Sequence, residues 1–310
     1  MRSTKRSTMH STSTLTRHSV RAICCVLVSL FLLSSAIRAQ QPPTVVFMTD
    51  FGVNDDSVAL CKGVMYGIVP NLRIVDLTHQ VNAFSIADGA RFLFGAAPYF
   101  ASGTVFVAVV DPGVGSSRKA VVVKSKRGQF YVLPDNGLIT MVADRDGVEA
   151  IRAITDPEWM IGDKVSSTFH GRDIFSPVGA RIARGDDWTQ VGPAISEVVR
   201  LNLKTATLDA TGLTGEVIAL DGPFGNLITN ISADGFLKLG YRHGDRLKVT
   251  IAGREVEMLF VKTFSDVPLR QPLLYIDSRG RVSFALNQAS FAAAYRIEPP
   301  QAIFIPRKAK

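Results

Sequence analysis

An aspartate and an arginine lie seven residues apart around a tight turn, in the segment 109–119 (VVDPGVGSSRK). Asp111 directly follows the apolar run Thr104 to Val110, whose β-branched and aromatic composition is typical of a buried parallel strand. A proline and a glycine come next, and they enforce a turn that holds the Asp111 carboxylate on a fixed backbone. Arg118 is close enough in sequence to fold back over that carboxylate. The segment therefore predicts either a catalytic carboxylate–guanidinium pair or an ordinary strand exit with a surface ion pair.

Two histidines are candidates for the titratable partner of such a pair. His170 lies in SSTFHGRD (166–173) and precedes a glycine just ahead of a predicted helix, and His79 follows the strand end Asp76-Leu77-Thr78. A lone histidine is more often structural than catalytic, so both interpretations stay open. No His-x-x-x-His or paired-cysteine spacing supports a metal centre. A metal site of oxygen and imidazole ligands would have to combine Asp50, Asp55, Asp111, His79 and His170.

Further polar residues follow the first predicted strand and lie on two turns in the second half of the chain. Asp50 ends the first strand, where a carboxylate can accept both hydroxyls of a ribose. Asp55 and its neighbour Asp56 could instead only cap the next helix. In DGPFGNLITN (221–230) an asparagine has the donor and acceptor that an adenine edge needs, and a phenylalanine can stack on a base. A hairpin turn explains that segment equally well, and Ser278-Arg279 could bind a carboxylate or form a solvated turn.

The strand ends that carry these residues belong to an alternating pattern. Residues 44–110 read as strand, helix, strand, helix and strand, which predicts a parallel sheet covered by helices. Later strands make the sheet mixed. The expected strands are Thr44–Met48, Arg73–Asp76, Thr104–Val110, Ala120–Lys124, Gln129–Leu133 and Ala150–Ile154, and the expected helices are Ser57–Val69, Ile86–Ala96 and Ile174–Ala183.

The sequence pattern changes after Gly192-Pro193, where short predicted strands alternate with glycine-rich turns. This pattern predicts a small antiparallel barrel or sandwich, with a tight hairpin turn at 252–254. The roughly 270 residues after the leader, in a chain that is 46% hydrophobic overall, also favour two domains over one. The expected organisation is a leader at 1–39, an α/β domain at 40–195, a linker at 196–212 and a barrel domain at 213–310. The expected barrel strands are Glu216–Leu220, Leu227–Ile231, Arg246–Ile251, Glu255–Phe260, Leu273–Ile276 and Val282–Leu286.

The first 39 residues have the composition of an export signal. Basic residues precede the apolar run Ala22 to Leu33, and small residues offer a cleavage site before Gln40. Six of the 35 basic residues and none of the 27 acidic ones lie in this leader, so its removal lowers the net charge from +8 to +2 and leaves no basis for nucleic-acid binding. We expect a periplasmic or secreted protein without stable membrane association, with an uncleaved anchor as the alternative. Cys61 is the one cysteine after the leader, so no internal disulfide is expected.

Long motifs across essentially the whole mature chain resemble the S-adenosylmethionine hydroxide adenosyltransferase family, the adenosine-forming S-adenosylmethionine hydrolases, and the related fluorinases and chlorinases. The motifs are TDFGVNDDSVALCKGVM, IVDLTH, GTVFVAVVDPGVGSSRKA, LPDNGLIT, SSTFHGRDIFSPVGA, FGNLITNI and the SRG turn. The resemblance implies a Rossmann-like N-terminal domain and a C-terminal β-barrel. It also implies a homotrimer whose sites lie between one subunit's N-terminal domain and its neighbour's barrel.

The same resemblance implies a role for each matching residue. Asp111, Arg118 and His170 match the aspartate, arginine and histidine that surround the attacking water, and Asp50 matches the ribose-binding carboxylate. Around the methionine part, the matches are Asp55 and Ser57 nearby, Asp221 at the ammonium, and Ser278 and Arg279 at the carboxylate. Around the adenine, they are Asn226, with Phe224 stacking nearby, and Asn287 and Gln288 at a backbone contact. Phe84 matches an aromatic wall.

The implied reaction is attack of water on the 5′ carbon of S-adenosylmethionine, in line with the departing sulfur and without a cofactor. Because the leaving group is a neutral thioether, the protein mainly has to position one water in a dry pocket. Arg118 should weaken Asp111 as a base, which leaves His170 as the expected proton acceptor near neutral pH. The alternatives are an exported nucleoside-binding protein without turnover, a metal-dependent hydrolase and a halide-using halogenase.

Overall fold

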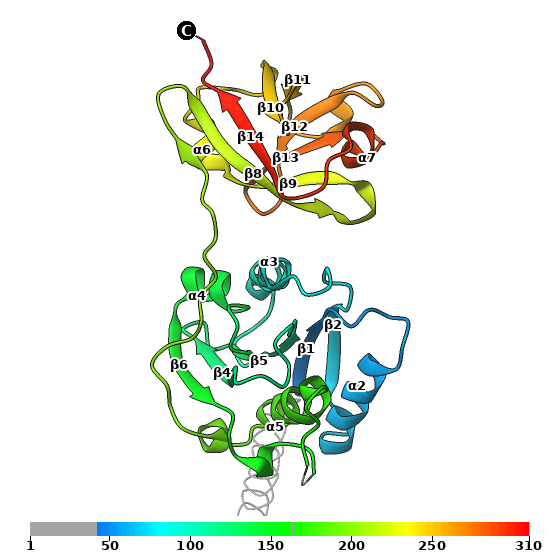
Figure 1. Ribbon diagram of the computed structural model, residues 1–310, viewed down its shortest axis with the longest axis vertical. Coiled ribbons are helices and arrows are strands. Elements are labelled where there is room, and N and C mark those ends of the chain that lie inside the picture. Colours follow the sequence, from blue (N-terminus) through cyan, green and yellow to red (C-terminus); the bar gives the residue numbers. More distant parts are fainter. Residues whose placement is uncertain (1–41, 163, 310) are drawn as a thin grey trace, which may run out of the picture.

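The computed structural model describes residues 42–162 and 164–309 of the chain. Figure 1 shows an α/β unit and a β-barrel, joined by an extended segment that runs upward past α4 to the barrel. The expected leader at 1–39 lies outside the described residues. Within the described ranges, no helix is long and apolar enough to cross a membrane.

Six strands form the sheet of the α/β unit, in the order β2-β1-β3-β5-β4-β6. β2, β1, β3 and β5 pair in parallel, and β4 and β6 add antiparallel strands at one edge. The central strand β3 is buried at every position because helices cover both faces of the sheet. The predicted mixed, largely parallel sheet is therefore confirmed. The strands span β1 Thr44–Thr49, β2 Arg73–Thr78, β3 Val105–Val109, β4 Ala120–Ser125, β5 Phe130–Pro134 and β6 Val148–Ala153.

Two pairs of helices cover the sheet and give the unit three layers (Figure 1). One face packs against α2 and α5 in a core that includes Cys61 and Phe175, and the other packs against α3 and α4 in a core that includes Leu93 and Val142. The sequence did not predict α4, because its seven residues are too few to show a helical period. The helices span α2 Ser57–Ile68, α3 Ile86–Ala96, α4 Thr140–Asp146 and α5 Ser176–Arg184.

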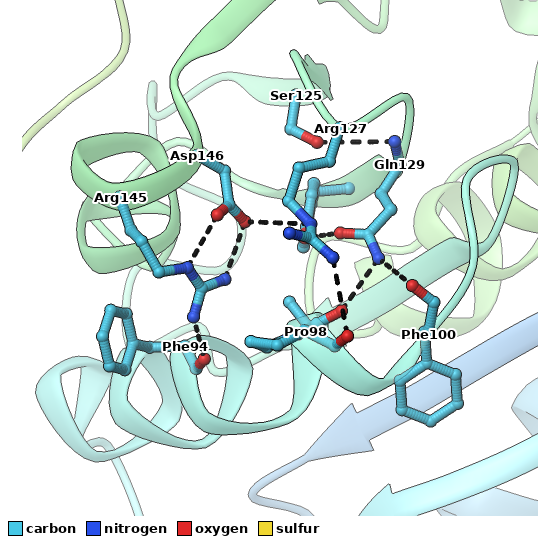
Figure 2. A network of polar contacts seen from close by, with 10 residues as sticks. Phe94, Pro98, Phe100, Ser125, Arg127, Gln129, Arg145 and Asp146 are labelled. Carbon is cyan, nitrogen blue, oxygen red and sulfur yellow. Dashed lines mark hydrogen bonds and ion pairs between the residues drawn. The ribbon is translucent and has the colours of Figure 1, made fainter. Parts of the chain in front are cut away.

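A polar network fixes the C-terminal end of α3 against the hairpin of β4 and β5 (Figure 2). The Gln129 amide donates to the backbone carbonyls of Ala97 at 2.9 Å and Phe100 at 2.7 Å. From α4, the Arg145 guanidinium donates to the carbonyl of Phe94. The bond from Arg145 satisfies a carbonyl in the last turn of α3, where residue 98 is a proline without an N–H to donate. Because α3 is held at this end, its first turn keeps a defined position above the sheet.

Seven strands close the second unit into a barrel. They pair in the order β14-β10-β11-β12-β13-β9-β8, β8 pairs back to β14, and β7 adds to β8. The predicted barrel is confirmed, and its pairings are antiparallel except for a short parallel contact between β11 and β12. The tight turn at 252–254 joins β10 to β11, with φ of 50° at Ala252 and 75° at Gly253. The strands span β7 Thr207–Leu208, β8 Gly212–Asp221, β9 Asn226–Ser232, β10 Arg246–Ile251, β11 Arg254–Phe260, β12 Pro272–Ile276, β13 Arg281–Leu286 and β14 Gln301–Pro306.

Candidate active site

Three of the predicted site residues meet at the carboxyl edge of the parallel strands. Asp111 follows β3, and Arg118 lies in the loop that leads into β4. His170 directly precedes η3 (Gly171–Phe175), a five-residue π-helix that continues into α5. Loops that follow neighbouring parallel strands converge at such an edge, which is where open α/β sheets hold their ligands. π-Helical turns of this kind frequently lie at functional sites.

Asp111 and Arg118 form a bidentate ion pair. Arg118 Nε donates to Asp111 Oδ1 at 3.0 Å, and Arg118 Nη2 donates to Asp111 Oδ2. The side chains are only 5% and 10% exposed for the aspartate and the arginine. A pair this shielded differs from a surface ion pair, since removing one partner leaves a buried charge uncompensated. The structure therefore excludes the solvated strand exit that the sequence left open.

The same guanidinium also fixes the tautomer of His170. Arg118 Nη2 lies 2.6 Å from His170 Nδ1. A guanidinium has donors and no acceptor, so Nδ1 must accept this hydrogen bond and the ring proton of the neutral imidazole is on Nε2. His170 therefore presents an N–H donor on its other side. A base that receives a proton at Nδ1 is incompatible with this contact.

The surroundings of His170 favour its neutral form. Burial lowers the pKa of the imidazole below its ordinary value, and the positive charge of Arg118 lowers it further. The carboxylates of Asp111 and Asp173 act in the opposite direction without reversing the shift. The electrostatics and the hydrogen bond to Nδ1 thus agree on an uncharged ring near neutral pH.

Close packing of two loops brings the ion pair and the histidine together. Gly115 adopts φ of 77°, and a Cβ added there would lie 2.3 Å from the carbonyl oxygen of Ser167. Only glycine fits such a position. On the other side, the buried Asp173 carboxylate accepts from the backbone N–H of Ser166 at 2.8 Å and from the guanidinium of Arg172. These contacts tie the loop before His170 to the π-helix after it.

A pocket of about 250 Å³ opens beside this cluster. Its walls combine the Asp50 and Asp111 carboxylates and the His170 imidazole with aromatic rings, and every residue that lines it lies between 50 and 171. The sequence analysis did not single out Phe51 and Phe169, whose rings meet edge to face with centroids 5.9 Å apart. Their position directly beside Asp50 and His170 was the available signal. An apolar pocket with a few convergent polar groups is the usual form of a small-molecule site.

Asp50 and Phe84 are held together at the rim of the pocket. The Phe84 N–H donates to Asp50 Oδ2 at 3.0 Å. Phe84 has φ of 65°, which is unusual for an aromatic residue, and its side chain is 74% exposed. A strained residue with a large exposed ring at a pocket rim is consistent with contact to a ligand or to another subunit.

Asp55 and Ser57 lie at the start of α2, and their contacts are local. Asp55 Oδ1 accepts from the N–H of Ser57, the first residue of the helix, at 3.0 Å. The N-cap residue itself is Asp56, which makes no side-chain cap bond. His79 is 7% exposed and contacts Thr49 and Asp76.

The barrel candidates lie on three separate turns next to its strands. Asp221 ends β8 and Asn226 begins β9, and Asn226 Nδ2 donates to Asp221 Oδ2 at 3.3 Å. Phe224 lies between them with its side chain 66% exposed. Tyr275, which sequence reasoning missed, is close enough to be affected by this turn. Burial, together with the charges of Asp221 and Asp277, raises the pKa of its hydroxyl to about 12.

The other barrel candidates occupy two further turns. Ser278 and Arg279 follow β12, where Asp277 Oδ1 accepts from the Arg279 N–H at 2.8 Å. The Arg279 guanidinium lies against α3 of the same chain, since a Cβ added to Gly95 would be 2.8 Å from its Cζ. Asn287 is buried and its amide donates to the Val267 carbonyl at 2.8 Å, so this side chain is structural. Gln288 follows it with φ of 53°.

Two further observations bear on the alternatives from the sequence. Among the described residues, no group of three or more histidine, cysteine, aspartate and glutamate side chains is arranged to hold a metal ion. Asp50, Phe84, Asp111, Arg118 and His170 are brought together within one α/β unit. The barrel residues lie on the separate turns described above.

Comparison with known proteins places most of the described chain in one group. Models of the SAM hydroxide adenosyltransferase N-terminal and C-terminal domains match residues 45–192 and 215–304, where SAM denotes S-adenosylmethionine. A (R)-S-adenosyl-L-methionine hydrolase of Salinispora tropica is 38% identical over 260 residues, which cover 83% of this chain and 95% of that protein. A fluorinase of Actinopolyspora mzabensis is 31% identical, over 86% of this chain and 97% of the fluorinase.

Solved structures agree with this grouping. An uncharacterized conserved protein from Thermotoga maritima superimposes with a TM-score of 0.81 at 36% identity, over 84% of this chain and 99% of that one. A conserved hypothetical protein from Thermus thermophilus gives a TM-score of 0.67 at 32% identity, over 86% and 100% of the two chains. The two family matches, the shared fold and these identities show that the chain belongs to the SAM hydroxide adenosyltransferase family.

Proposed function

We propose that this protein hydrolyses S-adenosyl-L-methionine to adenosine and L-methionine. The observation that carries the proposal is the Arg118 guanidinium, which holds the Asp111 carboxylate and the His170 imidazole beside one pocket. Relatives named (R)-S-adenosyl-L-methionine hydrolase support the substrate. Aromatic walls and a carboxylate at the Asp50 position suit a nucleoside.

Water attacks the 5′ carbon in line with the sulfur. The C5′–S bond breaks with its electron pair moving to sulfur, the O–C5′ bond forms, and the spare water proton leaves the new hydroxyl. Because methionine departs as a neutral thioether, catalysis depends on placing and orienting the water more than on strong acid or base.

The tautomer of His170 changes the roles that the sequence led us to expect for His170 and Asp111. With Nδ1 accepting from Arg118, the ring offers its Nε2–H to the water oxygen as a donor. The Asp111 oxygens retain free lone pairs beyond those that accept from Arg118, so Asp111 is the group that receives the water proton. Arg118 then acts by fixing the positions of Asp111 and His170 relative to each other.

The adenosine and methionine parts of the substrate would lie between two chains of a homotrimer. Asp50 would bind the ribose hydroxyls, Asn226 the adenine edge, and Arg279 with Ser278 the methionine carboxylate. The exposed rings of Phe84 and Phe224 support such an arrangement, since burying each against a neighbour removes a large apolar surface from water. Light scattering of the purified protein would test the trimer, and a monomer with full activity would contradict it.

The function is tested by incubating the purified mature protein with S-adenosyl-L-methionine and following adenosine and methionine by chromatography. We expect both products in equal amounts, with no dependence on an added cofactor and no loss on treatment with a chelator. Binding of adenosine without turnover would identify a nucleoside-binding protein instead, and loss of activity on chelation would identify a metal-dependent hydrolase.

We also propose that the protein is exported through its leader at 1–39. The support is the basic and then apolar composition of that segment with small residues before Gln40. Mass spectrometry of the N-terminus after cell fractionation tests this. A mature N-terminus near Gln40 in the exported fraction supports export, and an intact leader in the cytoplasmic fraction contradicts it.

A further inference from the structure

His79 lies in a hydrogen-bonded chain of side chains that runs from the exposed Asp76 carboxylate to the buried Thr49, next to the candidate active site. Its Nδ1 is 2.9 Å from Thr49 Oγ1, and its Nε2 is 3.0 Å from Asp76 Oδ1. Thr49 is fully buried and His79 is 7% exposed. The imidazole also packs edge to face on Phe47 in β1, with centroids 4.9 Å apart. The His79 ring is therefore contacted on three sides.

The hydrogen bonds of this chain have one consistent direction. Asp76 Oδ2 also accepts from the Lys62 ammonium at 2.6 Å. Burial raises the pKa of Asp76, but the bonds from Lys62 and His79 outweigh this effect, so the pKa lies below its ordinary value. An ionised Asp76 accepts from Nε2–H of His79. In the neutral imidazole Nδ1 then accepts from the Thr49 hydroxyl, whose oxygen in turn accepts from the Phe51 N–H at 3.2 Å.

The inner end of the chain holds the turn that carries Asp50 and Phe51. The His79 carbonyl accepts from the Gly52 N–H at 2.7 Å, and the Thr49 carbonyl accepts from the Val81 N–H at 3.4 Å. Together with the Thr49 hydroxyl, these bonds enclose Asp50 and Phe51 on both sides. Both enclosed residues line the pocket.

The outer end begins at an irregularity in the sheet. β1 and β2 pair in register from Thr44 to Phe47, and the register then shifts by one residue, so that Met48 faces Thr78. Such a bulge redirects the side chains that follow it. Here it is followed by His79, which contacts the end of β1.

We propose that His79 is a positioning residue, which acts through the Thr49 hydroxyl to fix the backbone of Asp50 and Phe51 and thereby the ribose end of the pocket. The inference rests on the proposed function for its substrate, because Asp50 is the assigned ribose contact. It adds a role for a histidine that touches no reacting atom. Loss of the chain should weaken nucleoside binding more than it slows the chemical step.

Thr49 offers an isosteric test. In Thr49→Val the hydroxyl is replaced by a methyl group of similar shape, and we expect KM for S-adenosyl-L-methionine to rise about tenfold, with kcat changing less than KM. Thr49→Ser keeps the hydroxyl and should restore KM to within about twofold of the wild-type value. Thr140→Val is the matched control, since the Thr140 hydroxyl is equally buried and bonds to the Gly137 carbonyl at 2.6 Å away from the pocket. It should lower Tm and leave KM unchanged.

Two His79 variants test the Thr49 contact and the Asp76 contact separately. Asparagine can keep an acceptor for Thr49 but is too short for Asp76, whereas glutamine can reach Asp76 but leaves Thr49 without an acceptor. We expect His79→Asn to bind more tightly than His79→Gln. Affinity for adenosine by calorimetry gives this comparison without turnover, so it separates a failure of this inference from a failure of the hydrolase assignment. Equal affinities in both variants, or unchanged KM in folded Thr49→Val, would overturn the positioning role.

Discussion

Arg118 Nη2 lies 2.6 Å from His170 Nδ1, and the same guanidinium pairs with both oxygens of Asp111. One side chain therefore decides the tautomer of the histidine and the orientation of the carboxylate. Since Arg118 and His170 are 52 residues apart in the chain, this relationship depends on the fold that brings β3 and η3 to the same edge of the sheet.

Removing either partner of Arg118 should disable the chemical step. We expect Asp111→Ala and His170→Ala each to lower kcat about a hundredfold or more, the scale of water positioning and proton transfer, with a smaller effect on KM. Single-turnover measurements of adenosine formation check this. Glu149→Ala is a suitable control, because it removes an exposed ion pair with Lys124 at 2.8 Å. Turnover near the wild-type rate in either site variant would remove that residue from the mechanism.

The pH profile should reflect the neutral state of His170. Its folded-state pKa lies below the ordinary value of 6.5, so the unfolded chain binds a proton at this residue before the folded protein does. The stability that depends on this group is therefore present above pH 6.5 and is lost as pH falls through the folded-state pKa. We expect kcat to stay level from pH 8 down past 6.5 and to fall only at lower pH. In Arg118→Gln an NMR titration should show a higher pKa for the imidazole, and an unchanged value would contradict the electrostatic role of Arg118.

Gly115 should be intolerant of a side chain. A Cβ there would lie 2.3 Å from the Ser167 carbonyl oxygen, and φ is 77°, so Gly115→Ala must separate the loops that carry Arg118 and His170. We expect a loss of about 1–3 kcal/mol in the free energy of unfolding together with a reduced kcat. Gly63→Ala in α2 is the control, because a Cβ at this helical position meets nothing within 4 Å and should be neutral or stabilising. Denaturant unfolding of both variants measures the difference, and equal stabilities would show that the loops adjust freely.

How much of this architecture the sequence reveals depends on whether the relevant signal is local. Unbroken apolar runs such as Val105–Val109 and stop signals such as Pro70 are local, so the sheet and its first two helices agree with the prediction to within two residues at most ends. The strand end at Asp111 and the glycine after His170 are also visible in the sequence. The contact of Arg118 with Nδ1 joins residues 52 positions apart and arises from tertiary geometry, so residue spacing alone gave no basis for it.

The same limit explains the elements that were missed. β14 is a strand of six residues whose partners β8 and β10 lie far back in the chain. Its apolar run Ile303–Ile305 is short and was not predicted as a strand, and pairing with both β8 and β10 closes the barrel. The role of His79 was likewise invisible, since its partners Thr49 and Asp76 become neighbours only when β1 and β2 pair.

Asn226 should contribute to recognition of the base. Its side chain is only 5% exposed and bonds to Asp221, which leaves the amide oxygen available to a ligand. We expect Asn226→Ala to weaken adenosine binding by about 1–3 kcal/mol, the cost of leaving buried base-edge groups unpaired. Asn230→Ala, in the same strand, is the matched control, because that side chain accepts from the Glu216 N–H and should affect stability alone. Unchanged affinity of Asn226→Ala in calorimetry would remove this residue from the site.

The protein should use water and not halide as its nucleophile. Relatives named fluorinase are 31% identical to this chain, and the family resemblance places a tyrosine and a serine in the halide-using enzymes where this chain has Asp111 and Gly171. A carboxylate at the nucleophile position repels a halide at close range, and a glycine provides no hydroxyl to replace the water that a halide must lose. We expect adenosine as the major product of the wild-type protein even in high chloride or fluoride.

The structure adds a reason why one substitution should not reverse this preference. A Cβ added to Gly171 would lie 2.9 Å from Phe51 Cζ, so Gly171→Ser has to displace a ring that lines the pocket. We expect this variant to lose adenosine formation without gaining 5′-halo-5′-deoxyadenosine. The double variant Asp111→Tyr with Gly171→Ser should show the same lack of halide product, because Phe51 is still in place. Chromatography of reactions in chloride and in fluoride distinguishes the products. A halogenated nucleoside as the major product of the wild-type protein would contradict the hydrolase assignment while leaving the substrate assignment intact.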